Sequence, residues 1–195
     1  MQNSAFVSEA GNCYTRIERP CKSPARRTGY ADGGPWASMT MTTTLLLSVL
    51  IGIIAGLRSM TAPAAVSWAA RAGWLNLAST GLAFLGSALT PWILTALALA
   101  ELVADQLPTT PSRKAPLGFG ARIVTGAFSG AALGAAGGSF VAGAIAGAIG
   151  AVIGTFGGHA SRARLAASFG RDRPAALIED AVAIGGALLI MAALK

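Results

Sequence analysis

The chain has 195 residues, of which 53% are hydrophobic and only 12% are charged. A soluble domain carries about 25% charged residues because its surface faces water, so this composition excludes an ordinary soluble globule. The mean hydropathy of +0.59 instead predicts an all-α, polytopic helical membrane protein. The net charge of +7 does not predict nucleic-acid binding, because the basic residues lie between apolar runs and form no stripe interleaved with aromatic residues.

Residues 1–38 differ from the rest of the chain, since they are polar and broken by prolines. They lack the apolar core of a signal peptide, and Met39 and Met41 stand directly before the first apolar run. Two interpretations remain open, an over-extended gene start and a disordered cytoplasmic leader. In both, residues 39–195 form a single helical transmembrane domain. The only cysteines, Cys13 and Cys21, lie in the leader and support neither a disulfide framework nor a metal site.

The first apolar segment is interrupted near its middle. Residues 42–57 are apolar, Arg58 follows them, and Pro63 disfavours helical geometry at the residue before it. Apolar sequence then resumes over 62–72. Two arrangements fit, one long helix kinked near 58–63 or two half-helices with a break between them; residues 42–57 could also cross alone while 62–72 re-enters.

A second helix is expected over 91–107, and a glycine-rich stretch follows over 123–161. That stretch holds thirty-nine residues without Asp, Glu, Lys or Arg, which is too long for one crossing and suits two. Its spacing predicts a glycine-zipper hairpin at 123–158 with a turn at 137–139, because small residues let helix backbones approach closely. The glycine faces could pack within one subunit or form a pore lining or an oligomer seam. The glycines expected to pack are Gly126, Gly130, Gly134, Gly143, Gly147, Gly150, Gly154 and Gly158.

A basic loop over 159–173 and a last helix over 174–194 complete the expected order of about five transmembrane helices. Basic loops are retained on the cytoplasmic side of a membrane. With a cytoplasmic N-terminus, the loops around Arg113 and Arg162 face the cytoplasm and the turn at 137–139 faces outward. The sequence therefore predicts a multi-pass protein of the cytoplasmic (inner) membrane.

Several ionisable residues interrupt the apolar runs. A charge at the bilayer centre costs about 2.5–3.5 kcal/mol, so such groups usually face a cavity or a partner. One interpretation is a polar pathway for an ion, a proton or a small solute. The other is that carboxylates near helix ends reach water at little cost. The candidate pathway residues are Arg58, Thr61, Glu101, Asp105, Arg122, Glu179 and Asp180.

Signals of an enzyme are nearly absent from the sequence. His159 is the only histidine, so neither a histidine-based triad nor a histidine metal cluster can be assembled. No catalytic residue, cofactor or metal is therefore expected. A shared GxRxxT pattern at 56–61 and 120–125, each followed later by an acidic pair, raises the further hypothesis of two related halves.

Four segments in order resemble an uncharacterised bacterial integral-membrane family, domain of unknown function 4126: GLRSMTAPAAVSWAA, ELVADQLPTTPSR, GARIVTGAFSGAALG and PAALIEDAVAIGGALLI. The resemblance covers about residues 42–194. It implies a small multi-pass bacterial membrane protein and supplies no activity, cofactor or catalytic residue. The polar leader is not part of the family pattern, which favours a start at Met39 or Met41.

Two functions remain open from the sequence. The first is a small transporter or channel for an unknown ion or solute, whose polar residues converge at mid-membrane depth. The second is a non-catalytic structural or assembly protein that packs through its glycine faces against itself, as a homo-oligomer, or against a partner. Both place the chain in a lipid bilayer, and a membrane-embedded enzyme comes after them for want of catalytic residues.

Overall fold

The computed structural model describes residues 6–7, 13–14, 40–104, 116–169 and 172–195. The chain divides into two units, Met1–Gly33 and Gly34–Lys195. In the first unit, β1 (Phe6–Val7) pairs antiparallel with β2 (Cys13–Tyr14). The rest of the predicted leader lies outside the described residues.

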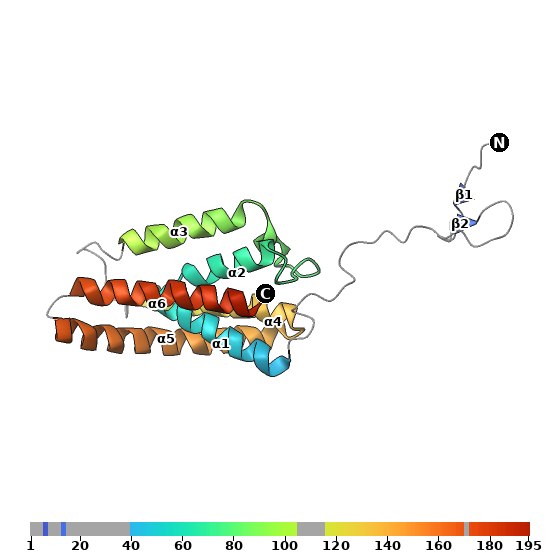
Figure 1. Cartoon of the computed structure of the whole chain (residues 1–195). Helices are drawn as coiled ribbons and strands as arrows, with labels where there is room; N and C mark the ends of the chain where they lie inside the picture. The colour runs from blue at the N-terminus through green and yellow to red at the C-terminus, as the bar shows by residue number, and fades with distance from the viewer. Residues whose placement is uncertain (1–5, 8–12, 15–39, 105–115, 170–171) are drawn as a thin grey trace. The chain divides into compact units, whose positions relative to one another are not determined.

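The described part of the second unit is all-helical, as the sequence predicts (Figure 1). Two segments, Phe140–Ser168 and Pro174–Ala193, are long and apolar enough to cross a membrane, and each contains an 18-residue window with a mean hydropathy of 1.9. By length and composition, they support a protein associated with a membrane. The helices are α1 (Met41–Leu57), α2 (Thr61–Arg71), the 3-10 helix η2 (Ala83–Gly86), α3 (Thr90–Ala104), α4 (Pro116–Ala136), α5 (Phe140–Phe169) and α6 (Asp172–Ala193).

The chain reverses direction between α1 and α2. Arg58 ends α1 in an extended conformation (φ −140°, ψ 111°), and α2 starts at Thr61. The start of α1 lies at the α4–α5 turn, because a Cβ on Gly137 would meet the Thr44 side chain. Leu82, which follows α2, lines a pocket at the same turn, so α2 runs back along the bundle. A single kinked helix over 42–72 is therefore wrong, and the alternative of two separate helices is confirmed.

The predicted turn at 137–139 joins α4 to α5. Gly138 adopts φ +78°, a conformation that glycine reaches without strain. The Gly138 N–H donates to the Ala135 carbonyl at 3.3 Å, and the Ser139 N–H donates to the Gly134 carbonyl at 2.7 Å. This is the Schellman pattern that ends many helices at a glycine. The prediction of a turn here is confirmed.

Glycines let α1, α4 and α5 pack backbone to backbone. A Cβ on Gly130 would overlap the backbone of Gly143, and one on Gly150 would overlap α1 at Val49. The Ser48 hydroxyl lies 3.3 Å from the Gly130 carbonyl oxygen, to which it donates a hydrogen bond between α1 and α4. All predicted packing glycines face neighbouring helices of the same unit in this way: Gly126, Gly130, Gly134, Gly143, Gly147, Gly150, Gly154 and Gly158.

The six α-helices alternate in direction, so the chain passes along the bundle six times. Helix α6 runs antiparallel to α1, since Asp180 contacts Arg58 while Gly186 lies against Ile54. The bundle thus has a turn end, where residues 137–139 and the start of α1 lie, and a charged end, where Arg58 and Asp180 lie. The start of α1 and the turn at 137–139 therefore lie at the same end of the bundle.

The charged end also differs from the predicted basic loop. Residues 159–173 were expected to leave the helix after Gly158, but α5 continues to Phe169. Arg162 and Arg164 are therefore helical residues. The last helix begins at Asp172, close to the expected 174.

Candidate functional site

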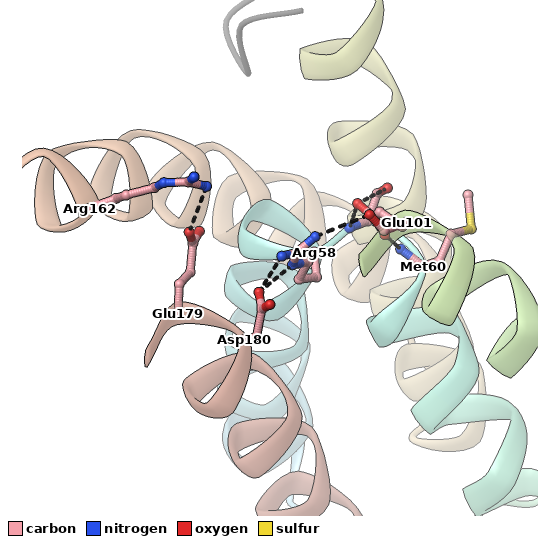
Figure 2. A network of polar contacts seen from close by, with 7 residues as sticks. Arg58, Met60, Glu101, Arg162, Glu179 and Asp180 are labelled. Atoms are coloured by element: carbon pink, nitrogen blue, oxygen red, sulfur yellow. Dashed lines mark hydrogen bonds and ion pairs between the residues drawn. The ribbon is translucent and has the colours of Figure 1, made fainter. Parts of the chain in front are cut away.

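A buried cluster of charged side chains gathers at the charged end, where α1 gives way to α2 (Figure 2). Arg58 comes from the end of α1, Glu101 from α3 and Asp180 from α6. The backbone N–H of Arg58 closes α1 by donating to the Ile54 carbonyl at 2.8 Å. The side chain of Arg58 is 0% exposed, and that of Asp180 is 6% exposed. The structure therefore brings together three residues that are far apart in sequence and were predicted to share a polar site.

Arg58 and Asp180 form a buried ion pair. The Arg58 Nε donates to Asp180 Oδ1 at 2.8 Å, and Nη2 donates to the same oxygen. Nη1 lies 3.4 Å from the backbone carbonyl oxygen of Glu101, to which it donates. Taking both charges of a buried ion pair out of water costs free energy, and removing one partner would leave the other charge uncompensated. The pair therefore ties the end of α1 to both α3 and α6.

Glu101 caps the start of α2 from a different helix. The residue before α2, Met60, makes no side-chain cap of its own. Glu101 Oε1 accepts hydrogen bonds from the Ser59 N–H at 2.9 Å and the Ser59 hydroxyl at 2.8 Å, and Oε2 accepts one from the Met60 N–H at 2.8 Å. A carboxylate is favourable there because unpaired N–H groups and the helix dipole make the N-terminus positive.

Glu179 precedes Asp180 on α6 and faces α5. A Cβ on Gly158 would lie 3.2 Å from Glu179 Oε1, and Arg162 Nη1 lies 3.8 Å from Glu179 Oε2. Arg162 was not among the predicted site residues, because it was assigned to a loop. The sequence nevertheless contains a pattern that points to Arg162. This residue continues the four-residue spacing of Gly150, Gly154 and Gly158 and so shares their helix face.

The other predicted residues lie around this cluster or outside the described chain. Thr61 is buried in the first turn of α2 and lines a cavity of about 280 Å³ between α2, α3 and α6. Arg122 is buried on α4, one turn before Gly126, which faces Ala55 of α1. That position places Arg122 near the level of Arg58. Asp105 lies outside the described residues.

The two GxRxxT patterns occupy different local structures. Arg58 lies at the break between α1 and α2, whereas Arg122 lies inside the continuous helix α4. The repeated pattern therefore does not correspond to two equivalent backbone segments.

The charges of this cluster contact partners on neighbouring helices and do not gather as a metal site. Among the residues that the structure describes, no group of three His, Cys, Asp or Glu side chains could hold a metal ion. Arg58 and Arg162 each face a carboxylate of α6, and Glu101 is held by N–H and O–H donors. Around Arg58 and Glu101, a charged ligand can be accepted only by exchanging one of these partners.

Comparisons of the chain with protein-family models, curated proteins and solved structures found no match. The function is therefore inferred from the arrangement of its own residues.

Proposed function

We propose that the chain is a small multi-pass protein of a bacterial inner membrane, and that it acts as a transporter or channel through the cluster of Arg58, Glu101 and Asp180. The supporting observation is the convergence of these residues at the break between α1 and α2. Ionisable side chains within membrane-spanning segments usually belong to ion or solute pathways. Interrupted helices likewise build the binding sites of many transporters.

The membrane arrangement that we propose has six passes, with α2 as a short helix enclosed by its neighbours. Helix α1 has 17 residues and rises about 26 Å, close to the hydrocarbon thickness of about 30 Å. The charged end carries the exposed or half-exposed Arg162 and Arg164, so we place it at the cytoplasm. The turn end, where α1 begins, then faces outward, and the hairpin of α4 and α5 forms a glycine zipper.

We also propose membership of the family named domain of unknown function 4126. Support comes from where the four resembling segments lie. One segment contains Arg58, the next Glu101, the third Arg122, and the last Glu179 and Asp180. The segments that carry the resemblance thus each contribute a charged residue at or near the cluster.

A flux assay in proteoliposomes tests the transport proposal. Wild-type protein, Arg58→Ala and Glu101→Gln would be compared for a panel of small ions and solutes, with Arg164→Gln as a control for an exposed charge. We expect at least one flux in the wild type that falls about tenfold or more in both cluster variants, because removal of a single charge-stabilising donor or charge in a site costs about that much. The control should keep it.

Glu101→Gln separates a direct role from failure to fold, because the side chain keeps its shape while losing its charge. Folding of each variant would be checked by size-exclusion chromatography in detergent. Equal flux in all four proteins, or no flux in any, would refute the proposal.

A structural or assembly role is the second candidate, and the bonding of Glu101 favours it. Three described hydrogen bonds to its carboxylate come from the α1–α2 turn, as expected for a group that only holds the fold. This role predicts that Glu101→Gln leaves cellular function intact while Gly147→Leu abolishes it. The same pair of variants, scored by growth of a deletion strain carrying each, discriminates the two functions.

A further inference from the structure

A groove opens between α5 and α6 near the charged end and has a volume of about 390 Å³. Its walls are apolar along most of their length, with Ile53 of α1, Ile153 of α5 and Val182 of α6 among the lining residues. Its lining also includes polar side chains, Ser161, Arg162 and Glu179. The groove is therefore amphiphilic, with an apolar length and a charged end.

The groove is open along its glycine-lined side. A Cβ on Gly157 would meet no atom within 4 Å, although Cβ atoms on Gly154 and Gly158, on the neighbouring face of α5, would meet Ile53 and Leu57. From Ile153 to Arg162, α5 rises about 14 Å. That length accommodates the part of an acyl chain nearest the head group, with the polar end of the lipid at Arg162.

We infer that this groove binds one anionic phospholipid, with an acyl chain along the apolar walls and the phosphate at Arg162. The inference rests on the proposed membrane placement but not on transport. Basic pockets between transmembrane helices at the cytoplasmic side bind anionic lipid head groups, and a guanidinium pairs well with phosphate.

The charges around the polar end favour an anion. Arg162 is 20% exposed there, and Arg164 is exposed on the same stretch of α5. Among the described residues that line the groove, the carboxylate is Glu179, whose Oε2 lies 3.8 Å from Arg162 Nη1. A guanidinium has five N–H donors, so Arg162 can contact a phosphate while it still faces Glu179.

Native mass spectrometry tests the lipid and its charge. The full chain in detergent would be titrated with phosphatidylglycerol and, separately, with phosphatidylcholine of the same acyl chains. One basic side chain at a membrane surface contributes about a fivefold preference for an anionic head group, so we expect the first bound lipid to show that preference. Arg162→Gln should abolish it, whereas Arg71→Gln, a basic residue at the turn end, should retain it.

A second variant tests the acyl-chain path independently of charge. Gly157→Leu places a side chain in the open part of the groove and should reduce binding of both lipids about tenfold. Gly185→Leu is the matched control, since its Cβ also meets no atom within 4 Å and it does not line the groove.

Equal affinity of the wild type for the two lipids would overturn the inference, as would wild-type binding by Gly157→Leu. If Arg162→Gln does not fold, the lipid comparison in the wild type and the Gly157→Leu result still decide it. The lipid site and the transport proposal can fail separately. Wild-type protein that carries a flux but shows no preference for phosphatidylglycerol would overturn only the lipid site. Wild-type protein that shows the preference but carries no flux would overturn only the transport proposal.

Discussion

The two sides of this bundle are held together by different kinds of contact. On one side, α1, α4 and α5 meet at glycines so closely that an added Cβ would overlap a neighbouring backbone. On the other side, α3 meets α2 through side chains, with the Trp68 indole N–H donating to the Thr95 hydroxyl at 3.0 Å, and a cavity of about 280 Å³ separates α2 and α3 from α6. Added volume on the first side would meet backbone, whereas the second side has side chains around a cavity, so we expect the second side to adjust more easily.

The buried charges lie where these two sides meet. Arg58 ends α1, which belongs to the close-packed side, and its partners Glu101 and Asp180 come from α3 and α6. In the proposed transport function, the close-packed helix α1 would position Arg58. The less closely packed helix α3 would allow the partners of Arg58 to exchange. This is the physical reason for placing the function at the border and not along the glycine faces.

Substitution of Gly147 should have the largest effect. A Cβ there would overlap the Gly126 carbonyl oxygen and lie 3.0 Å from the Gly130 Cα, so Gly147→Leu must force α4 away from α5. We expect failure to fold or a loss of about 4 kcal/mol or more, because overpacking against backbone cannot relax by rotamer change. Folded yield and thermal unfolding in detergent measure it.

Gly185→Leu is the matched control for this prediction, since it lies in open space on α6. Its free energy of unfolding should change by less than about 0.5 kcal/mol. An unfolding midpoint of Gly147→Leu equal to that of Gly185→Leu would mean that the glycine side is as adaptable as the α2–α3 side.

Breaking the ion pair at the border should have the next largest effect. Asp180→Asn removes the charge that faces Arg58, which is 0% exposed. We expect the free energy of unfolding to fall by about 3 kcal/mol, as for other buried pairs that lose one partner. The double variant Arg58→Met with Asp180→Leu should recover much of that loss, because no charge is then left buried. Chemical unfolding of the wild type and of these two variants measures both effects, and equal loss in the single and the double variant would contradict the pairing.

The features that could be predicted from the sequence are those set by the backbone conformation and the spacing of residues close together in the chain. The turn at 137–139 needs a residue with φ > 0, and glycine at four-residue spacing marks a face where helices approach, so both were readable. The break near Arg58 was readable, but the choice between a kink and a return of the chain was not, because the return is held by Glu101, a carboxylate from α3 that binds the Ser59 and Met60 N–H groups. A contact across that sequence distance leaves no local pattern.

The charged end shows the same division. The sequence grouped Arg162 and Arg164 correctly, since both lie on the same stretch of α5. Whether α2 continues α1 or returns beside it stayed open, because the return is held by the contact of Glu101 with the start of α2.

The polar link between α2 and α3 should show the smallest effect. Thr95→Val keeps the shape of the side chain but removes the oxygen that accepts from the Trp68 indole and that donates to the Pro91 carbonyl at 2.7 Å. We expect a loss of about 1 kcal/mol, the net value of a typical hydrogen bond, and faster hydrogen exchange in α3. Thr125→Val is the control, since its hydroxyl bonds only within α4. A loss as large as that of Asp180→Asn would show that α3 is anchored as firmly as the glycine helices, and the contrast between the two sides would then fail.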